Sequence, residues 1–314
     1  MTIQRLRVVS DNDYSGDPDG LVQLAHQLLS PSTDLRVVIG SRLRAGDGFD
    51  PSQSTADNAA ARARDVIAAL STAHHGQTPL VIAGSNDALK DEATPIESAA
   101  AKAIVAEAMR DDTGLPLYVT CGAGLTEIAS AWLMEPRIAE RLTLVWIGGA
   151  EDPVLAIPPP HSSSVEYNLA IAVTAARVVF NRSNLPIWQV PRNAYRQALV
   201  SMAEIEERIR PHGAIGRMLH GAIDAVRASA GSAGDSLGET YILGDSPLVL
   251  LTALQSSFQP DPSSSSFVMR PAPFIRGDGT PDFRPTGRPI RVYTQLDVRL
   301  MLDDLFVKLR RLEQ

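Results

Sequence analysis

Four aspartates lie close together near the start of the chain. The segment 8–20 reads VVSDNDYSGDPDG and contains Asp11, Asp13, Asp17 and Asp19. Carboxylates this close repel one another unless a cation or a proton offsets their charge. Oxygen-only ligands suit Ca²⁺ or Mg²⁺ rather than zinc, and the glycines and the proline of the segment permit a tight turn around an ion. The segment therefore predicts a metal-binding or catalytic loop, with a solvated acidic turn that caps a helix as the alternative.

The pattern around this loop predicts the elements that position it. Short apolar runs rich in β-branched residues are expected to be buried strands. They lie at 6–10, 35–40, 79–84, 115–120, 142–148 and 185–190. Stretches with helical spacing or many alanines lie between them, at 21–29, 55–71, 96–110 and 125–134. This alternation predicts an α/β protein with an open, mostly parallel sheet flanked by helices. Ligands bind beyond the carboxyl ends of the strands in such sheets, which is where the acidic loop would lie.

The remaining third of the chain is expected to complete the same fold. Residues 202–229 and 246–254 have helical patterns, and a strand at 290–294 followed by a helix at 298–312 would close the sheet. The Pro-, Ser- and Gly-rich stretch at about 256–287 is expected to be a loop excursion, because regular elements follow it. We therefore expect a single domain over residues 1–314.

Composition narrows the classes of function. The chain has 314 residues, and its 29 basic and 36 acidic residues give a net charge of −7, which argues against a nucleic-acid or membrane-surface binder. No apolar run approaches the roughly 18 residues that span a bilayer, and no signal-peptide pattern opens the sequence. The single cysteine, Cys121, excludes an intrachain disulfide framework, so a cytoplasmic location is expected. Cys121 could be a thiol nucleophile, although a small buried residue at the end of a strand explains it better.

Seven segments resemble one family in its own order. The acidic loop resembles the D-x-D-P-G-x-D-D signature of the inosine–uridine-preferring nucleoside hydrolase superfamily. It is closer to D-x-G-G-D-P-D-D, which belongs to a divergent nucleoside-hydrolase-like branch found in cellulose-binding proteins. The other six are VIGS at 38–41 (family V-x-G-N), GLTEIA at 124–129 (G-P-L-T-N-I-A), WIGGA at 146–150 (M-G-G), EYN at 166–168 (E-F-N), GDSP at 244–247 (H-D-P), and 292–312, which resembles the closing strand and helix.

The resemblance implies hydrolysis of the N-glycosidic bond of a ribonucleoside or related riboside. A Ca²⁺ ion would hold the ribose diol and a water, and Asp13 would be both a metal ligand and the general base for that water. Asp245 and the backbone carbonyl of Thr126 are implied as further metal ligands. The implied partner is a small-molecule nucleoside or riboside, and the family's common assembly implies a homo-oligomer, either a dimer or a tetramer.

The acidic loop departs from the family pattern, which has two adjacent aspartates. Here Pro18 separates Asp17 from Asp19, so both are assigned to the metal and the ribose diol without a division of roles. The resemblance also assigns ribose hydroxyl contacts to three later residues, namely Ser41, Glu166 and Asn168.

The acid that would protonate the leaving group is not evident. Gly244 stands where many family members have a histidine, which leaves His161 and Tyr241 as weak candidates. This departure favours a non-catalytic nucleoside or sugar binder as an alternative function.

A Mg²⁺-dependent phosphatase of the haloacid-dehalogenase type is the less favoured alternative. It would use Asp11 as the phosphoryl-accepting nucleophile and Asp13 as the acid/base. The residue four after Asp245 is Val249 rather than the aspartate that such phosphatases require.

Overall fold

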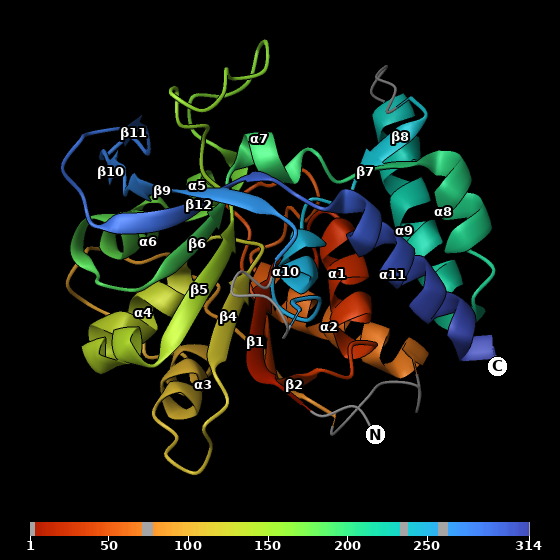
Figure 1. The fold of residues 1–314 in the computed structure, drawn as a ribbon, viewed down its shortest axis with the longest axis horizontal. Helices are drawn as coiled ribbons and strands as arrows, with labels where there is room; N and C mark the ends of the chain where they lie inside the picture. The colour runs from red at the N-terminus through yellow and green to blue at the C-terminus, as the bar shows by residue number, and fades with distance from the viewer. Residues whose placement is uncertain (1–3, 71–77, 233–237, 257–262, 314) are drawn as a thin grey trace.

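An eight-stranded sheet forms the centre of the computed structural model, which describes residues 4–70, 78–232, 238–256 and 263–313 (Figure 1). The order of its strands is β3-β2-β1-β4-β5-β6-β12-β9. Their bounds are β1 Leu6–Asn12, β2 Thr33–Gly40, β3 Leu80–Ala83, β4 Leu117–Cys121, β5 Leu142–Ile147, β6 Ile187–Val190, β9 Ser266–Pro271 and β12 Pro289–Gln295. Neighbouring strands pair in parallel, except that β9 runs antiparallel to β12 at one edge. The predicted α/β class and mostly parallel sheet are confirmed.

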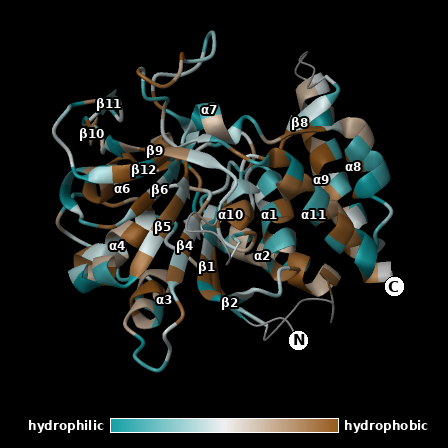
Figure 2. Ribbon diagram, in the orientation of Figure 1, coloured by the Kyte–Doolittle hydropathy of each residue, from teal (hydrophilic) through white to brown (hydrophobic). Residues whose placement is uncertain are grey.

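Helices cover both faces of this sheet. One apolar cluster contains residues of α3 Ala99–Ala108, α4 Thr126–Met134, α5 Tyr167–Ile171 and α6 Val173–Arg177. The other contains residues of α1 Asp19–Leu28, α2 Thr55–Leu70, α8 Met202–Arg208, α9 Gly213–Ser232, α10 Pro247–Leu250 and α11 Val298–Arg310. Successive strand residues face opposite clusters, as Val38 and Ile39 do, because side chains alternate along a strand. Both faces are therefore buried, and Figure 2 shows hydrophobic residues recurring along the central strands.

Shorter elements connect these layers. They are η1 Pro136–Glu140, η2 Val178–Arg182, α7 Arg192–Tyr195, β7 Leu199–Ser201, β8 Thr240–Ile242, β10 Phe274–Ile275, β11 Pro281–Asp282 and η3 Arg311–Glu313. In the part of the chain that the structure describes, no helix is both long and apolar enough to cross a bilayer.

Two stretches differ from the sequence prediction in detail. The helix expected at 202–229 is divided into α8 and α9, because Pro211 lacks an amide hydrogen and Gly213 has φ +65°. The helix expected at 246–254 is limited to α10, which is followed by turns. The stretch 256–287 contains β9 and the β10–β11 hairpin, while 257–262 lie outside the described residues.

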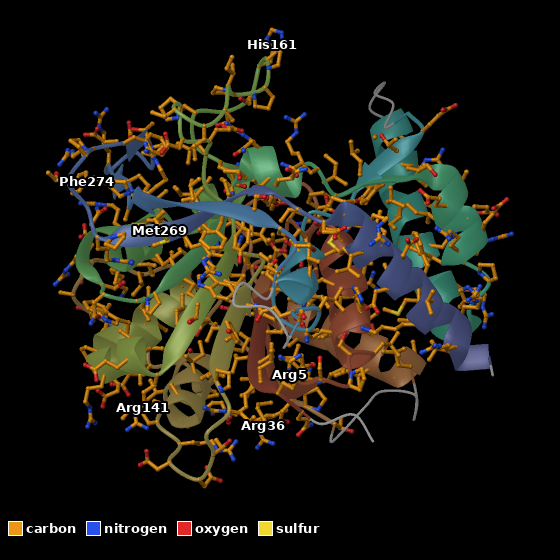
Figure 3. All side chains as sticks on the ribbon, viewed as in Figure 1. Arg5, Arg36, Arg141, His161, Met269 and Phe274 are labelled. Atoms are coloured by element: carbon orange, nitrogen blue, oxygen red, sulfur yellow. The ribbon has the colours of Figure 1, made fainter. Side chains whose placement is uncertain are left out.

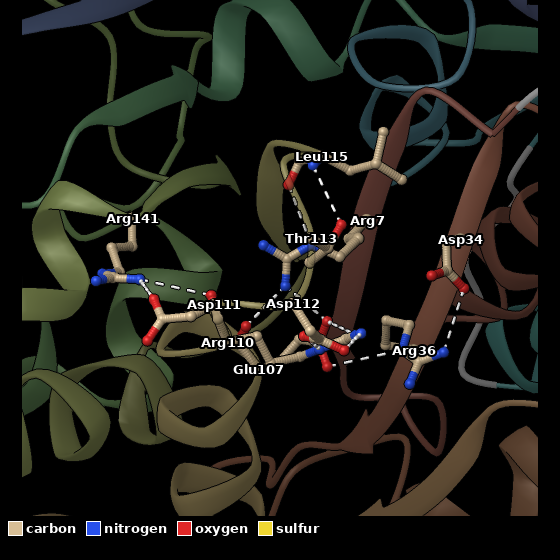
Figure 4. A network of polar contacts seen from close by, with 10 residues as sticks. All are labelled: Arg7, Asp34, Arg36, Glu107, Arg110, Asp111, Asp112, Thr113, Leu115 and Arg141. Carbon is tan, nitrogen blue, oxygen red and sulfur yellow. Dashed lines mark hydrogen bonds and ion pairs between the residues drawn. The ribbon is translucent and has the colours of Figure 1, made fainter.

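Ion pairs surround the amino end of β1 (Figure 4). The guanidinium of Arg7 donates to the Glu107 carboxylate at 2.7 Å and to the Leu115 carbonyl at 3.1 Å. Arg110 also donates to Glu107, and Arg36 lies 3.6 Å from it. Each buried charge at this end of the sheet therefore has an opposite charge beside it.

The acidic loop directly follows the carboxyl end of β1, which is an inner strand of the sheet. Strand register places Asn12 beside Gly40 of β2 and Asp11 beside Cys121 of β4. The loops that follow β1, β2, β4 and β5 therefore meet at one edge, where open α/β sheets bind ligands.

Candidate active site

A cavity of about 240 Å³ lies at this edge and brings together six of the predicted site residues. They are Asp13, Asp17, Asp19, Glu166, Asn168 and Asp245. The six come from three segments far apart in the sequence, namely the loop after β1, the start of α5 and the loop after β8. The fold thus brings most of the predicted site residues together.

Backbone turns hold the acidic loop in place. The amide of Gly16 donates to the Asp13 carbonyl at 2.6 Å, which closes a turn directly after Asp13. Asp19 is the first residue of α1, where a carboxylate interacts favourably with the helix dipole. Asp245 lies in the loop that follows the strand pair β7–β8. The Asp245 amide donates to Asp19 Oδ2 at 3.1 Å. Residues 226 positions apart are joined by this contact.

Burial and mutual repulsion perturb the aspartates. Burial first, and then the nearby carboxylates of Asp245 and Asp17, raise the pKa of Asp13 well above its ordinary value. Burial and the same kind of repulsion raise the pKa of Asp19 well above its ordinary value and that of Asp245 to about 7. None of the described residues that line the cavity is Lys, Arg or His. The cluster therefore needs protons or an added cation to offset its charge.

Asn12 occupies the space between the strand ends and Asp245. Its amide nitrogen donates to Asp245 Oδ2 at 2.9 Å, and its Oδ1 accepts from the Asp13 amide at 2.8 Å. A Cβ on Gly122 would lie 2.6 Å from this amide, so only glycine fits there. A Cβ on Gly20 would lie 3.1 Å from it, which is tight for any larger residue. Within the described ranges, no group of three or more His, Cys, Asp or Glu side chains is arranged to hold a metal ion.

Glu166 and Asn168 reach the cavity in different ways. Glu166 has extended backbone and is the N-cap of α5, with its Oε2 accepting from the Gly149 amide at 2.7 Å. The Tyr195 hydroxyl donates to the other oxygen, Oε1, at 3.0 Å. Asn168 lies inside the first turn of α5, and its amide donates to the Ile147 carbonyl at 2.9 Å. The Glu166 cap therefore starts a helix at these positions, and Asn168 follows in its first turn.

Tyr241 lies beside the cluster. Its hydroxyl donates to Asp17 Oδ1 at 2.7 Å, and the Asp19 amide donates to the same oxygen at 3.2 Å. Burial and the Asp17 carboxylate raise the pKa of Tyr241, which keeps the hydroxyl protonated. Tyr241 therefore contacts the predicted site through Asp17.

Besides Tyr241, three predicted site residues do not line this cavity. The Ser41 hydroxyl donates to Asp11 Oδ1 at 2.6 Å, so it connects two strand ends. Thr126 is the first residue of α4, and its buried hydroxyl has no partner among the described residues. His161 is exposed near the tip of a projecting loop, with φ +61° (Figure 3). Motif matches locate these residues in the fold, but they do not fix the direction of a side chain.

The residues on which two alternative functions depend are inaccessible. Asp11 is fully buried and bonded to Ser41, which is unsuitable for a phosphoryl-accepting nucleophile. Cys121 is also fully buried, and burial raises the pKa of its thiol well above the ordinary value. A protonated, buried thiol is a poor nucleophile.

Aromatic residues form part of the wall, and the sequence did not single them out. Phe49, Tyr167 and Tyr195 line the cavity. Phe49 follows β2 in a loop without a recognisable motif, and it remains 42% exposed. Tyr167 lies inside the EYN motif, which was its only available signal.

The sequence from residue 39 to 298 matches the model of one protein family, described as inosine-uridine preferring nucleoside hydrolase. The chain belongs to this family and is a nucleoside N-ribohydrolase-like enzyme, as the sequence motifs predicted. The matched range begins after the acidic loop, which is the segment that departs most from the family signature. No curated protein matches the sequence.

Solved structures share the whole fold at low sequence identity. The chain is similar to an inosine-uridine preferring nucleoside hydrolase from Bacillus anthracis, with 18% identity, 98% coverage of both chains and a TM-score of 0.67. It is similar to a purine-preferring ribonucleoside hydrolase from Gardnerella vaginalis, with 19% identity, 98% coverage of both chains and a TM-score of 0.69. It also resembles the effector protein XOO4466, with 18% identity, a TM-score of 0.58 and coverage of 98% and 93% of the two chains.

Proposed function

We propose that this protein hydrolyses the N-glycosidic bond of a ribonucleoside or related riboside in the 240 Å³ cavity, with Asp13 as the general base. The convergence of the buried aspartates with Glu166 and Asn168 in this cavity carries the proposal. The family to which the chain belongs supports riboside hydrolysis as the reaction class.

The charge of the cavity suits this reaction. Cleavage of the bond between ribose and base builds positive charge on the sugar ring, and carboxylates stabilise such charge. Asp13 has the chemistry of a general base, because its raised pKa increases the affinity of the carboxylate for the proton of a water.

Glu166 and Asn168 would orient the sugar. Tyr195 and Gly149 hold both oxygens of the Glu166 carboxylate, so its position is fixed before a ligand arrives. The Asn168 amide donates to the carbonyls of Gly122 and Ile147, which leaves its Oδ1 to accept from a ribose hydroxyl. Positioning of this kind lowers the entropic cost of reaching the transition state.

The donors of the cavity fit a hard divalent cation in chemistry, because they are buried carboxylate oxygens with no cationic side chain among the described lining residues. We propose calcium, held by Asp13, Asp19 and Asp245 after their side chains move to converge on the ion, with the Thr126 carbonyl as the further ligand that the resemblance adds. A bound Ca²⁺ would supply charge neutralisation and a lower pKa for a water in the cavity. Asp245 already accepts a hydrogen bond from Asn12, so a cation would share this carboxylate with the amide.

Protonation of the leaving group is assigned to the carboxyl of Asp17, whose pKa is raised by burial, with Tyr241 as the residue that positions it. The tyrosine hydroxyl remains protonated and points at Asp17, which lines the cavity. His161 lines neither this cavity nor its larger neighbour, so it has no part in this scheme.

Ribose release from purine and pyrimidine nucleosides tests the proposal. We expect reducing sugar from at least one nucleoside, loss of this activity with a chelator, and recovery when calcium is added back. Metal analysis of the purified protein should then find calcium. Calorimetric binding of nucleosides without any ribose release would instead indicate the non-catalytic binder, and phosphate release from a phosphate ester with magnesium would indicate the phosphatase.

A further inference from the structure

A second and larger cavity, of about 540 Å³, adjoins the proposed active site. Phe49 and Tyr167 line both cavities, so these two aromatic side chains form the wall between them. The remaining walls come from the loops after β1 and β2, from α2 and from α9. The proposed reaction uses none of this space.

The second cavity carries positive charge. Arg44 and Arg62 line it, and its one carboxylate among the described lining residues is Asp47. Arg62 is exposed and has no hydrogen bond or ion pair to any described residue. The Arg44 side chain is 53% exposed and uses its Nε on Asp47 at 3.1 Å, which leaves its terminal nitrogens available.

Asp47 offsets one of these two positive charges, so the described lining residues keep a net positive charge. It is 1% exposed, and the Tyr167 hydroxyl and the Phe49 amide also donate to it, at 2.9 Å and 3.1 Å. Both oxygens are therefore occupied by the protein. Asp47 fixes the aromatic wall and Arg44, while the guanidinium groups of Arg44 and Arg62 face the cavity.

Part of the lining of the second cavity is apolar. Leu21 and the α9 residues Ala222, Ala225 and Val226 line it. Apolar side chains and two guanidinium groups in one cavity suit an organic ligand that carries a negative group. The neighbouring cavity would repel the same group, because aspartates line it.

We propose that the second cavity binds an anionic group carried by the riboside whose sugar occupies the first cavity. The anion is a phosphate on the sugar or a carboxylate on the base, and either would pair with Arg44 and Arg62 beyond the Phe49–Tyr167 wall. The inference rests on the proposed function and names its substrate class: anionic ribosides are preferred over neutral nucleosides.

Three ribosides with related pyrimidine rings test this inference: uridine, uridine 5′-monophosphate and orotidine. Calorimetric binding and ribose release are measured for each. We expect one of the two anionic compounds to be favoured over uridine by about tenfold or more, as one added charge-assisted contact would give. The favoured compound identifies whether the anion lies on the sugar or on the base. Added salt should reduce the preference, because both arginines are partly exposed.

Arg62→Gln is the informative variant because Arg62 has no partner that its removal would leave unpaired. We expect the ratio of anionic to neutral affinity to fall by about tenfold. Arg217→Gln is the matched control, because Arg217 is exposed on α9, has no partner among the described residues and lines neither cavity.

The outcomes separate this inference from the proposed function. Ribose release without any preference for an anion would overturn the inference and leave the proposed function standing. An Arg62-dependent preference in binding without ribose release would support the inference and contradict the proposed function. A preference that Arg62→Gln retains, or no binding of any of the three compounds, would overturn the inference.

Discussion

Buried charges have opposite charges beside them at the amino end of β1, whereas like charges gather at its carboxyl end. At the amino end, Arg7 is 4% exposed and lies against the Glu107 carboxylate, with further arginines around it (Figure 4). At the carboxyl end, Asp13 and Asp245 are equally buried, yet other carboxylates are their nearest charged neighbours. Both ends belong to one strand and one fold, so burial alone does not distinguish them. This difference is what we expect if the first end stabilises the fold and the second end serves the proposed reaction.

Asp13→Asn, at the carboxyl end of β1, should have the largest effect on activity. We expect ribose release to fall by about a thousandfold or more, because the near-isosteric amide cannot take a proton. The thermal midpoint should not fall, since the change removes one repelling charge. Steady-state kinetics and circular dichroism check both parts, with the exposed Asp65→Asn on α2 as the control. Near-normal turnover in Asp13→Asn would reject Asp13 as the base.

Arg7→Met, at the amino end of β1, should lower stability and leave activity unchanged. Removal of the guanidinium leaves the Glu107 carboxylate buried with its closest partner lost, which costs about 3 kcal/mol of unfolding free energy. The kcat of the remaining folded protein should be unchanged, because Arg7 lies at the far end of the strand from the site. Chemical denaturation and kinetics measure the two quantities. A specific loss of kcat with normal stability would contradict the division between the two ends.

The stability of metal-free protein should depend on pH because of the carboxyl end. The pKa of Asp245 is raised from 3.8 to about 7, so the folded state binds a proton more tightly than the unfolded state. This contribution is fully present below the unfolded value and is lost as pH rises through about 7. We therefore expect the thermal midpoint to fall as pH rises from about 5 to about 8 in chelator, and calcium to restore it.

Asp245→Asn tests the cause of this pH dependence. The variant should show a flatter profile of thermal midpoint against pH in chelator, because one of the titrating carboxylates is gone. A profile as steep as that of the unmodified protein would place the pH dependence elsewhere.

Arg141→Gln should have the smallest effect. Arg141 pairs with Asp111 at 2.6 Å, but their side chains are 40% and 82% exposed (Figure 4). Exposed ion pairs contribute about 0.5 kcal/mol or less. We expect a change in unfolding free energy within that range and unchanged ribose release. A large loss of stability would show that exposed pairs at the amino end also support the fold.

The sequence predicted the sheet well because buried parallel strands are continuous apolar runs bounded by turns. It missed β9, whose Ser266 and exposed Met269 reflect a half-buried edge rather than a central strand. Six of the predicted site residues line one cavity, because motifs preserve their order and the fold brings their segments to one edge of the sheet. The direction of Ser41 and the contact of Asn12 with Asp245 could not be predicted, because they depend on the register of neighbouring strands.

Proton NMR of one reaction mixture tests the central claim most directly. The protein is incubated with a nucleoside and calcium, and the sugar and base signals are followed with time. The account predicts free ribose and free base in equal amounts from the unmodified protein, and intact nucleoside with Asp13→Asn. Intact purine and pyrimidine ribosides in both samples, or equal release by both proteins, would contradict it.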